Sequence, residues 1–255
     1  MTAGRTDTAA GSSPTASPRP PVLEEPDLGL LHDSEADELA AGEMVEDLQL
    51  AGIDLSGTDL SATTLMGCLL SEVFADDTDL SAARLVDCRL ERLSSTYLHS
   101  PRSTWRTVEL TGSRIGAWEL YDADIESLLI QDCRLGFANL AGTGLRDVLI
   151  RGTRIDELDL SGIEAQRVRF EDCRVGTLRL RGGSLSDVDL RGLEMSVVDG
   201  VDSLAGTTIS GEQLTELAPL MAVHLGLRVE DGREPAPQSA PTRRTGDRTR
   251  GTTDI

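Results

Sequence analysis

Large apolar side chains recur at every fifth residue through the middle of the chain, between Leu48 and Val198. The series consists of Leu50, Leu55, Leu60, Leu65, Leu70, Leu80, Leu85, Leu90, Trp105, Leu110, Ile115, Leu120, Ile125, Ile130, Leu135, Leu140, Leu145, Ile150, Ile155, Leu160, Phe170, Val175, Leu180, Leu185, Leu190 and Met195. A period of five matches neither the 3.6 of an α-helix nor the 2 of a β-strand. Such strict self-similarity predicts a solenoid, in which successive turns of the chain stack on one another.

The best-formed units of this series place Asp or Asn directly before the central Leu. They occupy residues 53–57, 58–62, 78–82, 138–142, 158–162 and 188–192. These units resemble those of pentapeptide-repeat proteins, in which Ala-Asp/Asn-Leu is followed by two free positions. The resemblance extends over residues 48–200 and implies an all-β fold, a right-handed quadrilateral β-solenoid with short helical caps at both ends. In that fold four units, or 20 residues, form one coil, and the central Leu points inward with the residue two positions before it.

We use the word column for residues spaced by 20, which stack on successive coils about 4.8 Å apart. One inward column is apolar throughout: Leu50, Leu70, Leu90, Leu110, Ile130, Ile150, Phe170 and Leu190. A second inward column is interrupted by Ala75 and Ser95, and Ser100 and Pro101 add a neighbouring defect. We therefore expect a bulge or loose coil over residues 94–104. A structural irregularity is the favoured interpretation, and a binding loop is the alternative.

The N-terminal part differs from the repeat in composition. Residues 1–30 are rich in Ser, Thr, Ala and Pro. They predict a disordered tail because they cannot bury enough apolar surface to offset the entropy of ordering. Residues 31–47 are acidic, and Ser34 is placed to cap a helix that runs to about Glu46 and covers the first coil.

The C-terminal part predicts a second cap. Residues 201–229 contain a capping box at Ser210 and Gln213, followed by a helix that is apolar on two sides. One side would close the solenoid, and the other would meet a partner. The second side predicts the seam of a homodimer, formed by Leu220, Val223 and Leu227. Residues 230–255 predict another disordered tail.

The charge of the chain argues against several classes of partner. The net charge is −20, which disfavours direct binding to nucleic acid or to an anionic membrane. No apolar run approaches the roughly 20 residues of a membrane span, and the N-terminus does not resemble a secretory signal. We therefore expect a cytoplasmic protein. Residues 48–200 contain 25 acidic residues and 16 arginines, a net charge of −9, so much of the negative charge lies outside the repeat.

Three outward columns are candidates for binding. An arginine column contains Arg114, Arg134, Arg154 and Arg174, with Asp132, Asp156 and Asp172 placed to neutralise it. An acidic column contains Asp59, Asp79, Glu119, Asp159 and Asp199, with His99, Asn139 and Arg179 between them. A third column carries Leu129 and Leu149, which would stack as a small apolar surface, between the expected ion pairs Arg89–Glu109 and Arg169–Asp189.

No residue pattern indicates catalysis. The four cysteines, Cys68, Cys88, Cys133 and Cys173, all fall two positions before a central residue, which predicts reduced, inward packing. A disulfide between Cys68 and Cys88 is the alternative, because one coil separates them. The three histidines are scattered along the chain. We therefore expect neither an enzyme nor a bound metal or cofactor.

Two functions remain. Some pentapeptide-repeat proteins resemble B-DNA in width and charge and inhibit DNA gyrase as dimers joined by C-terminal helices. The acidic column and the C-terminal helix favour such a DNA mimic, a modulator of DNA gyrase or topoisomerase. The stacked arginines oppose it, because they would make a poor copy of DNA. The sequence therefore favours a scaffold that binds another protein, and the DNA mimic is the alternative.

Overall fold

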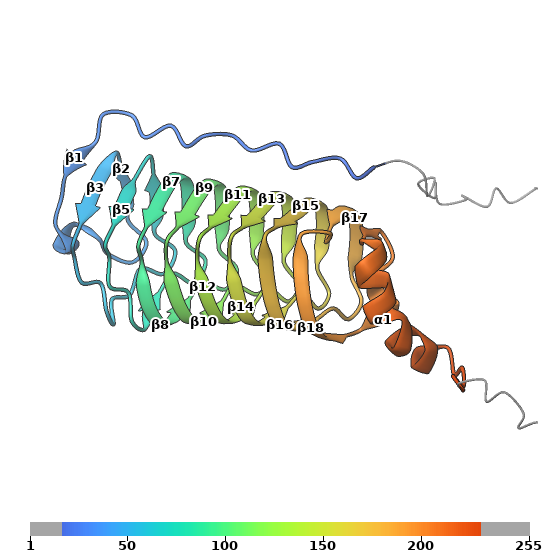
Figure 1. The fold of residues 1–255 in the computed structure, drawn as a ribbon. Coiled ribbons are helices and arrows are strands. Elements are labelled where there is room, and N and C mark those ends of the chain that lie inside the picture. The colour runs from blue at the N-terminus through green and yellow to red at the C-terminus, as the bar shows by residue number, and fades with distance from the viewer. Residues whose placement is uncertain (1–16, 231–255) are drawn as a thin grey trace, which may run out of the picture.

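A computed structural model describes residues 17–230, and it confirms the predicted β-solenoid. The chain winds into a rod of stacked coils with a helix at its C-terminal end, and an extended N-terminal segment follows one side (Figure 1). Three of the four corners in a coil turn through residues with positive φ, as at Ala82, Asp87 and Arg92. These tight corners separate short extended sides, which explains why a five-residue period produces strands.

Two parallel sheets form the sides of the rod. The first contains β1 (His32–Asp33), β2 (Met44–Glu46), β3 (Leu48–Ala51), β4 (Thr64–Met66), β5 (Leu69–Ser71), β7 (Arg84–Glu91), β9 (Thr104–Thr111), β11 (Asp124–Gln131), β13 (Gly144–Arg151), β15 (Glu164–Glu171), β17 (Ser184–Asp189) and β19 (Thr207–Thr208). The second contains β6 (Thr78–Asp79), β8 (Ser94–His99), β10 (Arg114–Glu119), β12 (Arg134–Asn139), β14 (Arg154–Asp159), β16 (Cys173–Arg179) and β18 (Leu193–Asp199). The helical elements are η1 (Ala36–Glu38), η2 (Val201–Ser203) and α1 (Gly211–His224).

The register between coils is 20 residues along the regular part of the rod. For example, Leu90 pairs with Leu110 between β7 and β9, and Ile115 pairs with Leu135 between β10 and β12. The inward columns therefore stack as predicted. Their side chains form one continuous apolar core from Leu39 to Leu217.

The coil at residues 94–104 is regular, so the predicted bulge is wrong. β8 pairs with β10 in register through this segment. Two tryptophans, Trp105 later in the same coil and Trp118 in the next coil, fill the space that the serines leave. The indole N–H of Trp118 donates to Ser100 Oγ (2.8 Å), and that of Trp105 donates to Ser103 Oγ (2.8 Å). The two rings pack edge to face, with centroids 5.5 Å apart. The indole rings occupy the core volume that the small serines leave, and the serine hydroxyls find hydrogen-bond donors, so the backbone of this coil keeps the regular path.

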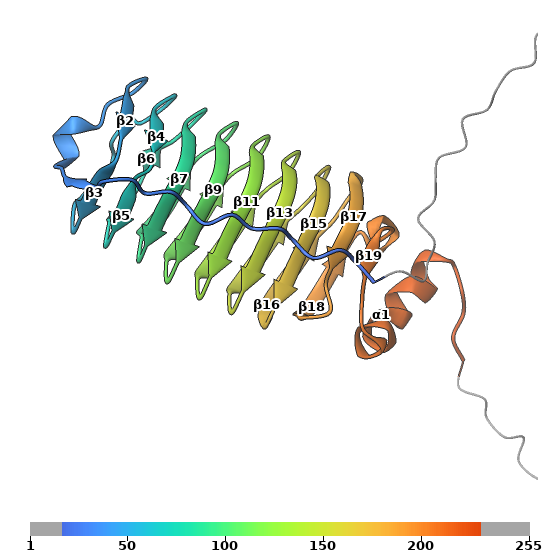
Figure 2. The same ribbon diagram turned by 90° about the horizontal axis from the view of Figure 1, so that it is seen from above.

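The predicted disorder of residues 17–30 is also wrong; the rest of that predicted tail lies outside the described residues. Residues 17–30, which we call the strap, run extended along the rod and cross the first sheet from β17 towards β3 (Figure 2). Pro18 and Pro26 are buried, whereas Leu23 and Leu28 are half-buried. The strap therefore packs on the solenoid although its composition is typical of a disordered tail.

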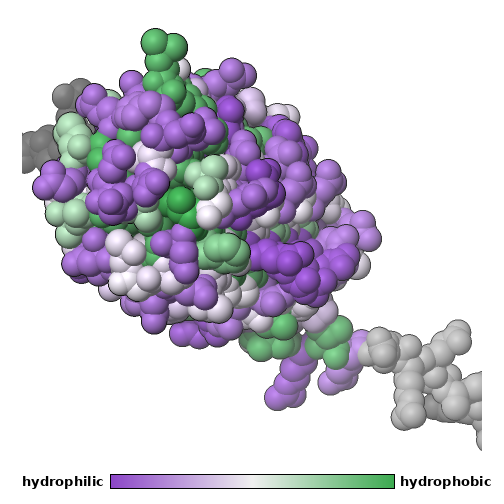
Figure 3. Space-filling view, turned by 90° about the vertical axis from the view of Figure 1, so that its left-hand side faces the viewer, coloured by the Kyte–Doolittle hydropathy of each residue, from purple (hydrophilic) through white to green (hydrophobic). Residues whose placement is uncertain are grey.

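The predicted N-terminal capping helix is replaced by a single 3₁₀ turn, η1. Ser34 does not cap it, because the residue before η1 is Glu35, whose side chain accepts no capping bond. Residues after η1 are extended instead, since β2 pairs with β4 in the first sheet. The end of the rod that carries η1 presents mainly hydrophilic residues, with hydrophobic ones in small groups (Figure 3).

The C-terminal cap begins later than predicted. β19 pairs with β17 through Val188 and Thr207, so the first sheet continues beyond residue 200. The predicted capping box of α1 is present: Ser210 Oγ accepts from the N–H of Gln213, and Gln213 Oε1 accepts from the N–H of Ser210. The predicted tail over residues 231–255 lies outside the described residues.

Candidate functional site: the outward columns

The arginine column is assembled as the sequence predicts. Arg114, Arg134, Arg154 and Arg174 pair in succession on β10, β12, β14 and β16, and all four side chains are exposed. Neighbouring parallel strands lie about 4.8 Å apart, so the column brings four like charges close together. Stacked like charges repel, and the arrangement is unfavourable unless partners relieve it.

Partners relieve only half of this column. Arg174 pairs with Glu194 (2.8 Å), and Arg154 approaches Asp156 (3.6 Å). Asp132 and Asp172, which we expected to neutralise the column, pair with none of its arginines. Within residues 17–230, Arg114 and Arg134 have no carboxylate within ion-pair distance. The column therefore ends in two uncompensated, exposed cations.

Beside these arginines the surface is flat. Gly116 and Gly136 lie two residues after Arg114 and Arg134 on the same strands. A Cβ added at Gly136 would lie 2.3 Å from the carbonyl oxygen of Gly116, so a side chain is excluded there without a shift of the backbone. The strip beside these exposed arginines therefore carries no side chain at Gly116 or Gly136.

The acidic column is in register, but its carboxylates serve the coils that carry them. Asp59, Asp79 and Asp159 each accept a hydrogen bond from the backbone N–H two residues later, at 2.9, 2.8 and 2.9 Å respectively. Hydrogen bonds from Ser61 lower the pKa of Asp59. Glu119 accepts from Asn139 Nδ2 (2.7 Å), and Asp199 pairs with Arg181 (2.8 Å). These groups close turns and link coils; Asp199 alone among the five is paired with a cation within residues 17–230, and the other four carboxylates are held by neutral donors.

The third column combines ion pairs with a small apolar step. Arg89 pairs with Glu109 (2.7 Å), and Arg169 approaches Asp189 (3.6 Å), as expected. Leu129 pairs with Leu149 between β11 and β13, but both side chains are half-buried. The strap crosses the same strands two residues away, where Glu24 binds Ser127 and Val22 binds Asp147. This apolar step is therefore smaller and less open than the sequence predicts.

Comparisons with known proteins add a fold likeness. No protein-family model matches the chain, and no curated protein sequence does. The chain is similar to trypsin-treated QnrB1, a plasmid-mediated fluoroquinolone resistance protein, with 19% sequence identity and a TM-score of 0.31. The matched region covers 75% of this chain and 93% of the QnrB1 chain. The chain is also similar to HetL, a pentapeptide repeat protein involved in heterocyst differentiation regulation from the cyanobacterium Nostoc, with 16% sequence identity and a TM-score of 0.33. That matched region covers 68% of this chain and 93% of the HetL chain.

Because these identities and TM-scores are low, the assignment rests on the chain's own five-residue units, left-handed corners and 20-residue register. The chain has the pentapeptide-repeat fold. The fold that the sequence resemblance implies is therefore confirmed, and the columns described above are the outer faces of a pentapeptide-repeat solenoid.

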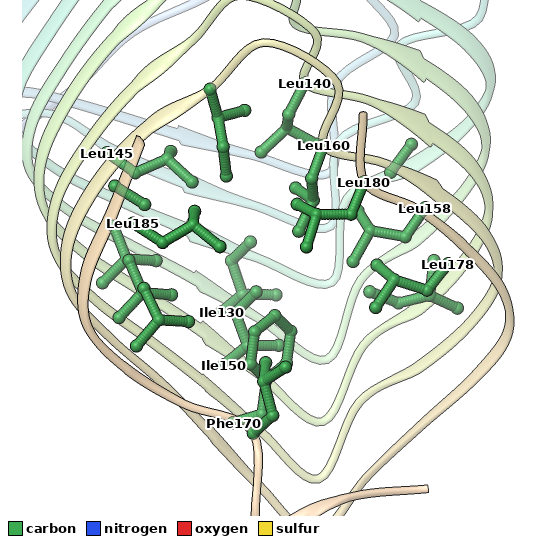
Figure 4. A pocket seen from close by; sticks show the side chains of 18 of the residues that line it. Ile130, Leu140, Leu145, Ile150, Leu158, Leu160, Phe170, Leu178, Leu180 and Leu185 are labelled. Carbon is green, nitrogen blue, oxygen red and sulfur yellow. The ribbon is translucent and has the colours of Figure 1, made fainter. Parts of the chain in front are cut away.

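The interior of this pentapeptide-repeat fold is packing and not a binding cavity. The void among the inward side chains has a volume of about 30 Å³ and is enclosed by residues such as Ile130, Leu140 and Phe170 (Figure 4). All four cysteines are buried and unpaired as disulfides. Burial raises the pKa of Cys133 and Cys173. The cysteines therefore act as small core residues, as predicted.

Within residues 17–230, no group of three or more His, Cys, Asp or Glu side chains could hold a metal ion. None of the helices in this part of the chain has the length and apolar character needed to span a membrane.

The C-terminal helix exposes the residues of the predicted dimer seam. Leu220 and Val223 of α1 and Leu227, three residues after its end, are 41%, 77% and 60% exposed, whereas Leu217 of α1 is buried against the solenoid. A groove of about 410 Å³ passes Val223 and Leu227. The two-sided helix is thus present, and the dimer stays a prediction.

We expect Val223→Glu with Leu227→Glu to convert a dimer into a monomer, because two charges would be buried at the seam. Light scattering on the full-length chain measures this as a halving of mass. Leu225→Glu, which changes another exposed apolar residue next to α1, is the matched control. A mass that is the same for the wild type and both variants would exclude α1 as the seam.

Proposed function

We propose that this chain is a non-enzymatic protein-binding scaffold, and that its arginine column is the face that binds. The observation that carries the proposal is the stack of four exposed arginines, of which Arg114 and Arg134 have no acidic partner within residues 17–230. A partner that presents carboxylates along an extended segment would relieve the repulsion and form charge-assisted hydrogen bonds. The flat strip at Gly116 and Gly136 would let such a segment approach closely.

Charge reversal tests this face. We expect Arg134→Glu with Arg154→Glu to weaken binding of the partner by about tenfold or more, because interface arginines carry a large share of binding energy. Quantitative affinity capture from the native cell identifies proteins that the wild type retains and this variant loses. Titration of the identified partner then gives both dissociation constants.

Arg84→Glu with Arg102→Glu is the matched control. Both arginines are exposed, neither has an acidic partner within residues 17–230, and neither belongs to the arginine column. The net charge changes by the same amount as in the test variant. Equal losses in the two variants would mean that overall charge governs binding, and the arginine column would then have no special role.

The alternative is the DNA mimic, which acts on DNA gyrase or topoisomerase. The structural roles of the acidic column weaken it, because those carboxylates are engaged within the coils. A replacement of Asp59, Asp79 and Asp159 by Asn removes charge and keeps an acceptor for each turn. Asn139 already does this in the same column, where its Oδ1 accepts from the N–H of Ala141. Salt-sensitive inhibition of supercoiling by the wild type, lost in this variant, would favour the mimic over the scaffold.

A further inference from the structure

The strap is anchored to one corner of the solenoid by three of its backbone N–H groups. Arg19 donates to Asp187 Oδ1 (3.1 Å), and its guanidinium pairs with the same carboxylate (2.6 Å). The other two donors are Val22, which binds Asp147 Oδ1 (2.9 Å), and Glu24, which binds Ser127 Oγ (2.8 Å). We call this corner the strap corner; in successive coils it consists of Asp47, Gly67, Asp87, Thr107, Ser127, Asp147, Arg167 and Asp187.

The strap is fully extended along the axis of the rod. Arg19 lies at Asp187, and a Cβ added at Gly29 would lie 2.7 Å from the carboxylate of Asp47. Ten residues of strap thus cover seven coil steps, about 34 Å, which is about 3.4 Å per residue and equals the rise of an extended chain. Each strap residue therefore has a defined place along the corner.

The composition of the strap suits this path. Pro18, Pro20, Pro21 and Pro26 have no N–H to satisfy, and their fixed φ reduces the entropy lost when an extended segment is ordered. The N–H groups of Arg19, Val22 and Glu24 lie between these prolines and find acceptors on the corner. Proline-rich peptides are bound in a similar way by other proteins, as preformed extended ligands.

The corner also discriminates by charge. The guanidinium of Arg167 holds Asp147 through two hydrogen bonds of 2.6 Å, so Asp147 is already neutralised when Val22 binds it. Asp187 has Arg19 as its one ion-pair partner within residues 17–230. Hydrogen bonds from Arg19 lower the pKa of Asp187, and those from Arg167 lower the pKa of Asp147. Within residues 17–230, three carboxylates of the corner, those of Asp47, Asp87 and Asp187, have no cationic partner on the solenoid, and Asp187 is the one at which the strap supplies an arginine.

Close approach of the backbone completes the site. A Cβ added at Gly67 would lie 3.4 Å from the carbonyl oxygen of Asp27 in the strap and 2.6 Å from the carboxylate of Asp47. Glycine at this point of the corner therefore leaves room for the strap and for that carboxylate. The corner is shaped to receive an extended chain.

We infer that the strap corner is a binding groove for extended, proline-containing peptides, which the protein's own residues 17–30 fill in cis. The external ligand that fits it is a peptide with the chemistry of the strap: an arginine for Asp187, free N–H groups three and five residues later for Asp147 and Ser127, and prolines between them. This groove is separate from the arginine column and involves none of its residues.

The cis strap is a strong competitor of any such peptide. A segment joined to its site by a short connection has an effective concentration in the millimolar range. Only one residue separates the strap from β1. A micromolar peptide should therefore enter only when the anchors of the strap are weakened, so the test uses full-length variants whose grooves are intact.

The first experiment uses a fluorescent peptide with the sequence of residues 17–30 and the full-length chain. Arg19→Glu in the chain repels the strap from Asp187 and leaves the groove unchanged. We expect this chain to bind the peptide at least about tenfold more tightly than the wild type does, because the binding-competent state becomes populated. Asp187→Arg in the chain should instead prefer a peptide in which Arg19 is replaced by Glu. If the Arg19→Glu chain and the Asp187→Arg chain each bound the unaltered peptide and the Arg19→Glu peptide equally well, the pairing of the peptide's arginine with Asp187 would be excluded and the proposal would be wrong.

A second full-length variant removes backbone anchors. Val22→Pro with Glu24→Pro deletes the donors to Asp147 and Ser127, whereas Glu25→Pro, the control, deletes an N–H that has no partner on the corner. We expect the first variant to bind the unaltered peptide and the control to behave as the wild type does. Thermal unfolding verifies that each chain is folded. If neither Arg19→Glu nor the double proline variant binds the peptide, the corner serves only the cis strap and the inference is wrong.

Discussion

Replacing Trp118 by Ala will lower the free energy of unfolding by about 3–5 kcal/mol, the range for a large aromatic side chain removed from a packed core. Trp118 is 1% exposed, contacts Trp105 and donates to Ser100. Removal leaves a cavity in a rod whose coils can collapse little, because each is hydrogen-bonded to the coils above and below. Denaturant unfolding followed by far-UV circular dichroism measures the change.

Two further variants make this prediction specific. Phe74→Ala removes an aromatic side chain that is 57% exposed, and it should cost less than about 1 kcal/mol. Ser100→Leu restores the apolar series between Leu80 and Leu120. Alone it should destabilise by overpacking against Trp118, but combined with Trp118→Ala it should recover part of the loss. A loss below about 1 kcal/mol for Trp118→Ala would show that the indole does not fill the space at Ser100.

The same coil shows where the sequence prediction of the fold reaches its limit. The five-residue period predicts the columns, the 20-residue register and the common phase of the cysteines, because each depends only on which residues point inward. It does not predict how neighbouring coils share volume. Ser95 and Ser100 are defects in their own columns, and the volume that compensates them comes from Trp105 later in the same coil and from Trp118 in the next coil.

The N-terminal region was less predictable for a different reason. The strap has the composition of a disordered tail, and no apolar period marks it. It is held by backbone N–H groups and by corner acceptors more than 100 residues away, such as Ser127 and Asp147. The residue type of a donor does not matter in such bonds, so composition carries little information about them. The spacing of prolines and leucines from Pro18 to Leu28 is the one local signal of a segment with a packed side.

Some features of the outward columns could likewise be predicted from the sequence, and others could not. The sequence predicts that the arginines stack, since register alone decides it. It does not predict that Asp132 and Asp172 pair with none of these arginines, because that depends on side-chain directions at a corner. In the acidic column, Asp59 and Asp79 have carboxylates that bind the backbone of their own turns. An Asp directly before the central residue of a repeat unit therefore indicates a turn before it indicates a binding surface.

Replacing Gln213 by Leu will release α1 from the solenoid and lower the free energy of unfolding by about 2 kcal/mol or more. It leaves the Leu193 carbonyl without its side-chain donor and removes one of the two donors to the Leu190 carbonyl, which also accepts from the N–H of Leu193. The side-chain amide of Gln213 is buried and donates to the carbonyl oxygens of Leu190 and Leu193, both at 2.7 Å. It also closes the capping box with Ser210. Leu keeps most of the apolar contact and removes every one of these bonds, so the variant isolates their contribution.

Amide exchange shows where the change occurs. Protection should fall along α1 and at β18, whereas β7 to β13 should be unaffected, since each coil contacts only its neighbours. Glu212→Gln, at the exposed neighbour of Gln213, is the matched control and should leave α1 protected. Unchanged protection of α1 in the Gln213→Leu chain would mean that Leu217 and Met221 hold the helix without the amide.

If α1 is also the dimer seam, its release should lower the mass in solution. Gln213→Leu and the double variant Val223→Glu, Leu227→Glu should then give the same mass. A dimer that survives release of α1 would place the seam elsewhere on the rod.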